Sequence, residues 1–230
     1  MCHARSTDSP LVGRLPAGEP PWILSRMSTD EVEGHPTREE LDNAHRTFRK
    51  YESRDVFYRA ATDLITLALR GETSINVAEA LAVLLQTWNR SYYRFHPATA
   101  QHFEDLEAVL AKDAGWLADI RSRSIDSFGV ADEAALISTF DDFEFVLGPV
   151  GAAKALHLLA PNFLPLWDRA ITRIYGLQLA RTGLNGPRYV RMIRTVQAQV
   201  ERLGGAAAVE GNPLKRIDEY NYCHYTKGWI

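Results

Sequence analysis

Apolar residues recur along most of the chain at intervals of three and four, the spacing of amphipathic helices. Thr37 and Glu40 form a capping-box pattern, so we expect a helix to begin there and to run to about Glu52. A second helix is predicted over residues 55–70. Its apolar face is expected to consist of Val56, Ala60, Leu64, Leu67 and Ala68.

The third predicted helix lies in an apolar part of the chain. Asn76 can cap a helix over 77–90 that is apolar on most sides, which indicates a central position in the core. The His-Pro pair at 96–97 interrupts the pattern. Two helices with polar faces are then expected over 98–112 and 115–123.

The second half of the chain also has helical periodicity. Asp132 can cap a helix over 133–146, and further helices are predicted over 151–159, 167–174, 188–203 and 214–222. The helix predicted over 133–146 begins an apolar stripe that consists of Ala135, Leu136, Phe140, Phe143 and Leu147. Alternating runs of strand length are absent from the sequence, so we predict an all-α, multi-helix globular fold.

Composition sets the domain organisation. Residues 1–35 are rich in proline and glycine and predict a flexible leader, which leaves 36–230 as a single helical domain. Two subdomains that meet near 95–130 are the alternative. No apolar run reaches the roughly 20 residues that span a bilayer, and no signal peptide is recognisable, so we expect no membrane partner and a cytoplasmic location. The oligomeric state stays open.

Cysteine and histidine usage argues against a metal or cofactor. The two cysteines, Cys2 and Cys223, form neither a disulfide framework nor a metal-binding pair. Seven histidines are scattered without the spacing of a zinc site. We therefore expect no metal and no cofactor.

Charge is distributed unevenly along the chain, although the net charge is only −3. Residues 101–146 contain eleven acidic and three basic residues, whereas 151–204 contain eight basic and two acidic residues. A cationic region of that kind suits a phosphate backbone, and basic and acidic faces that neutralise each other are the alternative.

Lys154 lies in the most apolar stretch of the chain, close to the point where the charge changes sign. Burial lowers the pKa of a lysine, and a nearby acid such as Asp168 would moderate that shift. A neutral amine is a candidate nucleophile. The alternative is that the ammonium group extends to water from an ordinary core helix.

Gly148, Val150 and Gly151 lie in a turn between two predicted helices, which together form a helix-hairpin-helix arrangement. The free backbone N–H groups at the start of the second helix can bind a phosphate group. The turn is followed by Lys154 and then by a Pro-Leu-Trp-Asp sequence that ends at Asp168.

The segment from about 140 to 175 resembles the helix-hairpin-helix base-excision DNA glycosylase superfamily. The resemblance implies that Lys154 attacks the sugar C1′, that Asp168 stabilises the cationic sugar, and that residues 147–151 hold the DNA backbone. Such an enzyme acts with or without lyase activity at abasic sites. An N-cap paired with Arg169 and Arg173 is the other role for Asp168, and the two roles are compatible.

Aromatic and amide side chains form the candidate base pocket. Trp88, Asn89 and Tyr92 end the central helix, and such residues suit a flipped base. His157 and Trp167 could join them. The alternatives are a helix end fixed by large aromatics for the first three, and ordinary core positions for the last two.

Arg188, Arg191 and Arg194 follow helical spacing on one face of a predicted helix. With Arg169 they could track a phosphate backbone, or they could simply be solvated. The function predicted from these features is a DNA-glycosylase-like protein, with DNA a better candidate partner than RNA. A non-catalytic helical nucleic-acid-binding or protein-interaction module, and a purely structural helical domain, are the alternatives.

Overall fold

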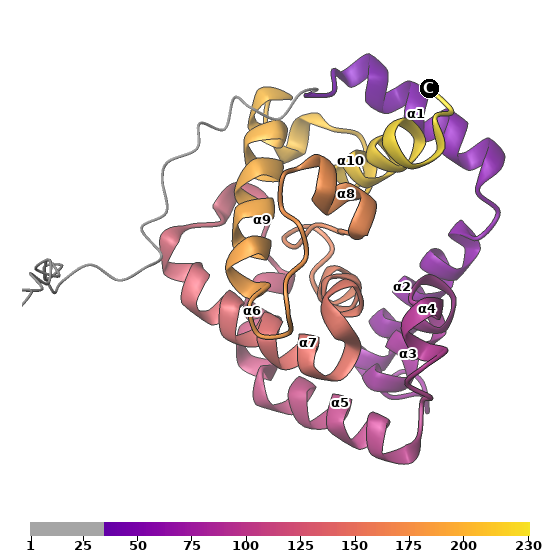
Figure 1. The fold of residues 1–230 in the computed structure, drawn as a ribbon, viewed down its shortest axis with the longest axis vertical. Helices are drawn as coiled ribbons and strands as arrows, with labels where there is room; N and C mark the ends of the chain where they lie inside the picture. The colour runs from indigo at the N-terminus through magenta and orange to yellow at the C-terminus, as the bar shows by residue number, and fades with distance from the viewer. Residues whose placement is uncertain (1–34) are drawn as a thin grey trace, which may run out of the picture. The chain divides into compact units, whose positions relative to one another are not determined.

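The computed structural model describes residues 35–230, which belong to one compact unit (Figure 1). The described residues form α, 3-10 and π helices and contain no strand, so the predicted all-α class is confirmed. The predicted leader lies, apart from His35, outside the described residues.

The first two helices have the bounds that the sequence predicts. Helix α1 (Arg38–Tyr51) begins at a complete capping box, in which the Glu40 carboxylate accepts the Thr37 backbone N–H at 2.7 Å. Helix α2 (Asp55–Arg70) follows after a short link.

The apolar face predicted for α2 is wrong at most of its positions, although Leu64 is partly buried against the core. Its buried residues are Ala61 and Ile65, whereas Val56 and Leu67 are 49% and 37% exposed. The helix carries apolar residues on more than one side, so periodicity alone cannot select the face that packs against the core. The contact with α3 (Val77–Trp88) determines which face of α2 is buried.

Helix α3 lies in the core, as predicted, and Asn76 caps it. Its buried side chains include Leu81, Leu84 and Leu85. The short helix α4 (Arg90–Tyr93) follows it. Then come α5 (Ala100–Lys112), α6 (Ala114–Arg121) and the 3-10 helix η2 (Ile125–Ser127).

Helix α7 (Val130–Leu159) begins earlier than predicted. Asp132 is not the N-cap residue. It lies in the first turn, where its carboxylate accepts the backbone N–H of Gly129 at 2.8 Å and pairs with Arg123, also at 2.8 Å. Because this carboxylate reaches back one turn, the helix begins three residues before the predicted start.

A break at one residue divides α7 into two parts. Gly148 has φ 69° and ψ 167°, a conformation that only glycine adopts readily, and Pro149 follows it directly. In Figure 1 the two parts of the helix run in different directions. The predicted turn and the two helices around it are therefore present, with the break confined to Gly148, but a helix-hairpin-helix element is not established by this.

The remaining elements complete the core. They are α8 (Arg169–Ile174), α9 (Gly186–Arg202), η3 (Ala206–Ala208), α10 (Pro213–Asn221) and the π-helix η4 (Tyr222–Lys227). An aromatic cluster of Phe140, Trp167 and Tyr189 joins α7, the segment before α8, and α9, with ring centroids 4.7–5.5 Å apart. Within residues 35–230, no helix combines the length and apolar character that crossing a bilayer requires.

Candidate functional site

Two adjoining cavities share three lining residues, Trp88, Lys154 and Asp168. The first, here called the Asp218 pocket, has a volume of about 190 Å³ and is lined mainly by α1, α3, α10 and the segment before α8. The second, here called the Gly148 groove, has a volume of about 640 Å³ and is lined by the end of α3, by α4 and by the break in α7. The predicted catalytic pair thus lies where the two cavities meet.

Lys154 is held at this junction by the second part of α7. Its Nζ donates a hydrogen bond to the backbone oxygen of Trp88 and lies 5.8 Å from the centroid of the Trp88 ring. Burial lowers the pKa of Lys154 to about 8, although Asp168 and Asp218 oppose the shift. A substantial fraction of the side chain is therefore neutral just above neutral pH.

Asp168 is the N-cap residue of α8. Its Oδ1 accepts the backbone N–H groups of Ala170 at 2.8 Å and Ile171 at 2.9 Å. No described residue donates a hydrogen bond to its second oxygen, Oδ2. The capping role is thus established, and Asp168 lines both cavities with one carboxylate oxygen that receives no hydrogen bond from residues 35–230.

Trp88 is positioned by a chain of aromatic contacts. Tyr58 stacks on it, with centroids 5.5 Å apart and an interplanar angle of 11°. The Tyr58 hydroxyl lies 3.0 Å from His157 Nε2, and His157 Nδ1 lies 2.8 Å from the Leu164 backbone oxygen. Burial lowers the pKa of His157 to about 4, so the ring is neutral: Nδ1 donates to Leu164 and Nε2 accepts from Tyr58.

His157 is fully buried and lines neither cavity. It supports Trp88 through Tyr58 and belongs to the core. Trp167 is 1% exposed, and its indole N–H donates to the Pro149 oxygen at 2.9 Å. It contributes one edge of the Asp218 pocket and otherwise packs in the core.

Asn89 and Tyr92 hold the break in α7. Asn89 Nδ2 donates to the Leu147 oxygen at 3.1 Å, and the Tyr92 hydroxyl donates to the Val146 oxygen at 2.7 Å. A Cβ atom at Gly151 would lie only 2.6 Å from Asn89 Nδ2, so this close approach requires glycine. Both side chains line the Gly148 groove and do not reach the Asp218 pocket.

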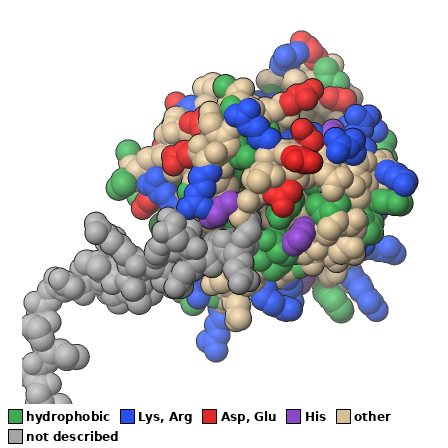
Figure 2. All heavy atoms as spheres, turned by 90° about the horizontal axis from the view of Figure 1, so that it is seen from above, with side chains coloured by type: hydrophobic (Ala, Val, Ile, Leu, Met, Phe, Trp, Pro, Cys, Tyr) green, Lys and Arg blue, Asp and Glu red, His purple; other side chains and the backbone are tan. Residues whose placement is uncertain are grey.

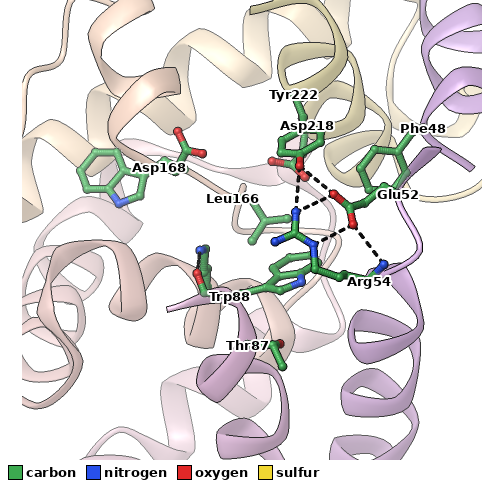
Figure 3. Close-up of a pocket in the computed structure, with 11 residues that line it drawn as sticks. Phe48, Glu52, Arg54, Thr87, Trp88, Leu166, Asp168, Asp218 and Tyr222 are labelled. Atoms are coloured by element: carbon green, nitrogen blue, oxygen red, sulfur yellow. Dashed lines mark hydrogen bonds and ion pairs between the residues drawn. The ribbon is translucent and has the colours of Figure 1, made fainter. Parts of the chain in front are cut away.

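The residues of the Asp218 pocket that were not predicted as site residues include Glu52, Arg54, Asp218 and Tyr222 (Figure 3). Arg54 donates from Nε and Nη2 to Glu52 at 2.8 and 2.7 Å, and from Nη2 to the Tyr222 hydroxyl at 3.0 Å. These hydrogen bonds from Arg54 lower the pKa of Glu52 to about 2. The aromatic composition of the sequence around Tyr222 was the only feature that could have indicated these four residues as part of a site.

The four arginines that were predicted to bind DNA differ in their position relative to the two cavities and in their partners. Arg169 is exposed and lines the Gly148 groove. Arg188 donates to the Leu184 oxygen at 2.7 Å, and Arg194 pairs with Glu133 at 2.8 Å. Arg191 is exposed, and Arg188, Arg191 and Arg194 line neither cavity.

Charges are mixed on the face of the molecule seen in Figure 2, where lysine and arginine side chains are interspersed with aspartate and glutamate side chains. Among residues 35–230, no group of three or more histidine, cysteine or acidic side chains is arranged to hold a metal ion.

No protein-family model, curated protein or solved structure matches this chain.

Proposed function

We propose that the protein is DNA-glycosylase-like: it binds duplex DNA along the Gly148 groove and accepts an extruded base in the Asp218 pocket. The observation that carries the proposal is that Lys154 and Asp168 line both cavities. If the base occupies the Asp218 pocket and the DNA backbone lies in the Gly148 groove, the sugar C1′ lies between the two cavities, beside the Lys154 amine and the Asp168 carboxylate.

The chemistry requires a neutral amine. Lys154 Nζ attacks C1′ with its lone pair as the bond from C1′ to the base breaks, and the base leaves with that electron pair and takes up a proton. Loss of a proton from Nζ and opening of the sugar ring, with the ring oxygen protonated, give an iminium. The free Asp168 oxygen stabilises the positive charge that develops at C1′ and the ring oxygen.

Borohydride trapping tests this function. A duplex that carries an abasic site and the wild-type protein should give a covalent adduct, because hydride reduces the iminium to a stable amine. Lys154→Ala should abolish the adduct. Lys50→Ala is the matched control, since Lys50 is exposed and lines neither cavity. An adduct that persists in Lys154→Ala, or no adduct with the wild type, contradicts the catalytic role.

DNA binding is tested separately by fluorescence anisotropy with a labelled duplex. Arg169→Gln should weaken binding and reduce the salt slope by about one, because one phosphate contact is lost. Arg46→Gln is the control, since Arg46 is exposed on α1 and lines neither cavity. Binding that does not depend on salt would remove the nucleic-acid proposal.

A non-catalytic nucleic-acid-binding module is the second candidate. It is favoured by one contact, the hydrogen bond from Lys154 Nζ to the Trp88 backbone oxygen, which ties α7 to α3. In that case Lys154→Ala lowers the melting temperature, and the wild type binds duplex DNA without forming an adduct. The two experiments above therefore separate the candidates.

A further inference from the structure

The polar end of the Asp218 pocket combines a hydrogen-bond donor with an acceptor, and neither is used by the proposed chemistry. Arg54 is oriented by Glu52 and Tyr222 through two of its three nitrogens. In Figure 3 the third nitrogen, Nη1, points away from these partners and toward the interior of the pocket. No described residue accepts a hydrogen bond from it.

Asp218 supplies the acceptor. Its side chain is only 16% exposed, and no described residue donates a hydrogen bond to its carboxylate. The nearest cation is Lys215, whose Nζ lies 3.6 Å from Oδ2. Burial raises the pKa of Asp218 to about 6, so the carboxylate is ionised at neutral pH and retains unused acceptor capacity inside the cavity.

The other walls of the pocket suit a flat ligand. Phe48, Trp88 and Tyr222 are aromatic residues that line it. Tyr58 stacks on Trp88 and fixes the indole plane. Any base can stack on aromatic side chains, so selectivity between bases must come from the polar end of the Asp218 pocket.

We infer, on the basis of the proposed function, that Arg54 and Asp218 recognise the edge of a guanine-type base. Guanine presents a carbonyl oxygen beside two adjacent donors, N1–H and the 2-amino group. The Arg54 guanidinium donates to that oxygen, and the Asp218 carboxylate accepts from the two donors. Uracil places one N–H between two carbonyl oxygens, so one of its oxygens would face the carboxylate.

Binding of free bases tests the inference without requiring any reaction. Titration calorimetry with the full chain would compare 9-methylguanine, 9-methylhypoxanthine, which lacks the 2-amino group, and 1-methyluracil. We expect 9-methylguanine to bind about tenfold more tightly than either of the others, the discrimination that one bidentate contact provides.

Asp218→Asn should remove this preference, because the amide offers only one acceptor oxygen and presents donors to donors. Asp63→Asn is the matched control, since Asp63 is exposed on α2 and lines neither cavity, and it should retain the preference. Arg54→Gln, a change at an exposed position, should weaken the binding of all three bases, because each presents a carbonyl oxygen to the guanidinium, and it keeps the assignment testable should Asp218→Asn fail to fold. Circular dichroism melting establishes which variants are folded.

Equal affinity for the three bases, no binding of any of them, a preference that survives in Asp218→Asn, or wild-type affinity in Arg54→Gln would overturn the assignment of Arg54 and Asp218. Its failure is distinguishable from that of the proposed function. The wild-type adduct with an abasic duplex forms at a sugar that carries no base, so it reports on Lys154 and not on base recognition. An adduct without base preference leaves the glycosylase-like proposal intact.

Discussion

Lys154 and His157 lie about one turn apart on α7, yet their surroundings give them opposite roles. His157 is enclosed by the core and has a hydrogen-bond partner at each ring nitrogen. Lys154 reaches the wall of two cavities. Burial lowers the pKa of both groups, but only Lys154 combines that shift with access to a ligand.

The pKa of Lys154 predicts the pH dependence of trapping. Below about pH 8 the ammonium form dominates, so the rate of adduct formation should rise roughly tenfold per pH unit and level off above that value. The rate would be measured by quenched trapping between about pH 6 and pH 9, with Lys154→Ala as background. A rate that is flat over this range, or that falls as pH rises, would contradict attack by the Lys154 amine.

At the scale of elements, the bounds of most helices could be predicted from sequence, because caps and periodicity are local. The capping box at Thr37, the cap at Asn76 and the stripe through Phe140 and Phe143 were recognisable in this way. The buried face of α2 was not, since it depends on a tertiary contact. The length of the break in α7 could not be predicted from sequence, because the turn residues do not reveal that only Gly148 leaves the helical conformation.

Gly148 should therefore be intolerant of substitution. Gly148→Ala places a Cβ at φ 69° and 3.1 Å from the Tyr92 ring, so we expect a loss of about 1–3 kcal/mol in the free energy of unfolding. Gly115→Ala is the control, because Gly115 is helical within α6 and a Cβ there meets nothing within 4 Å. That change should be neutral or stabilise by up to about 1 kcal/mol. Equal effects in urea denaturation would contradict the role of the break.

At the scale of the whole molecule, the Asp218 pocket is assembled from segments far apart in the sequence. Phe48 comes from α1, Arg54 from the start of α2, Lys154 from α7 and Asp218 from α10. Lys154 and Asp168 could be predicted because their segment has a recognisable composition. Arg54 and Asp218 could not, because a single charged residue on a helix has no pattern until folding places it beside the others.

Lys215 stabilises this assembly from within. It is 7% exposed, and its Nζ lies 3.6 Å from carboxylate oxygens of Asp55, Asp218 and Glu219. The same ammonium lies 4.2 Å from the centroid of the Phe48 ring. One buried charge thus connects α1, α2 and α10 and neutralises acids at the back of the pocket.

Lys215→Met should therefore destabilise the protein by about 3 kcal/mol or more at pH 7, because it leaves buried carboxylates without their cation. Without the ammonium, the pKa of Asp218, which burial already raises, lies still further above its unfolded value. The folded state then binds more protons than the unfolded state, so the loss should shrink as the pH falls from about 7 to about 5. Urea denaturation at the two pH values measures both effects, with the exposed Lys50→Met as control. A loss that is independent of pH would show that Lys215 contributes through its aromatic packing and not through its charge.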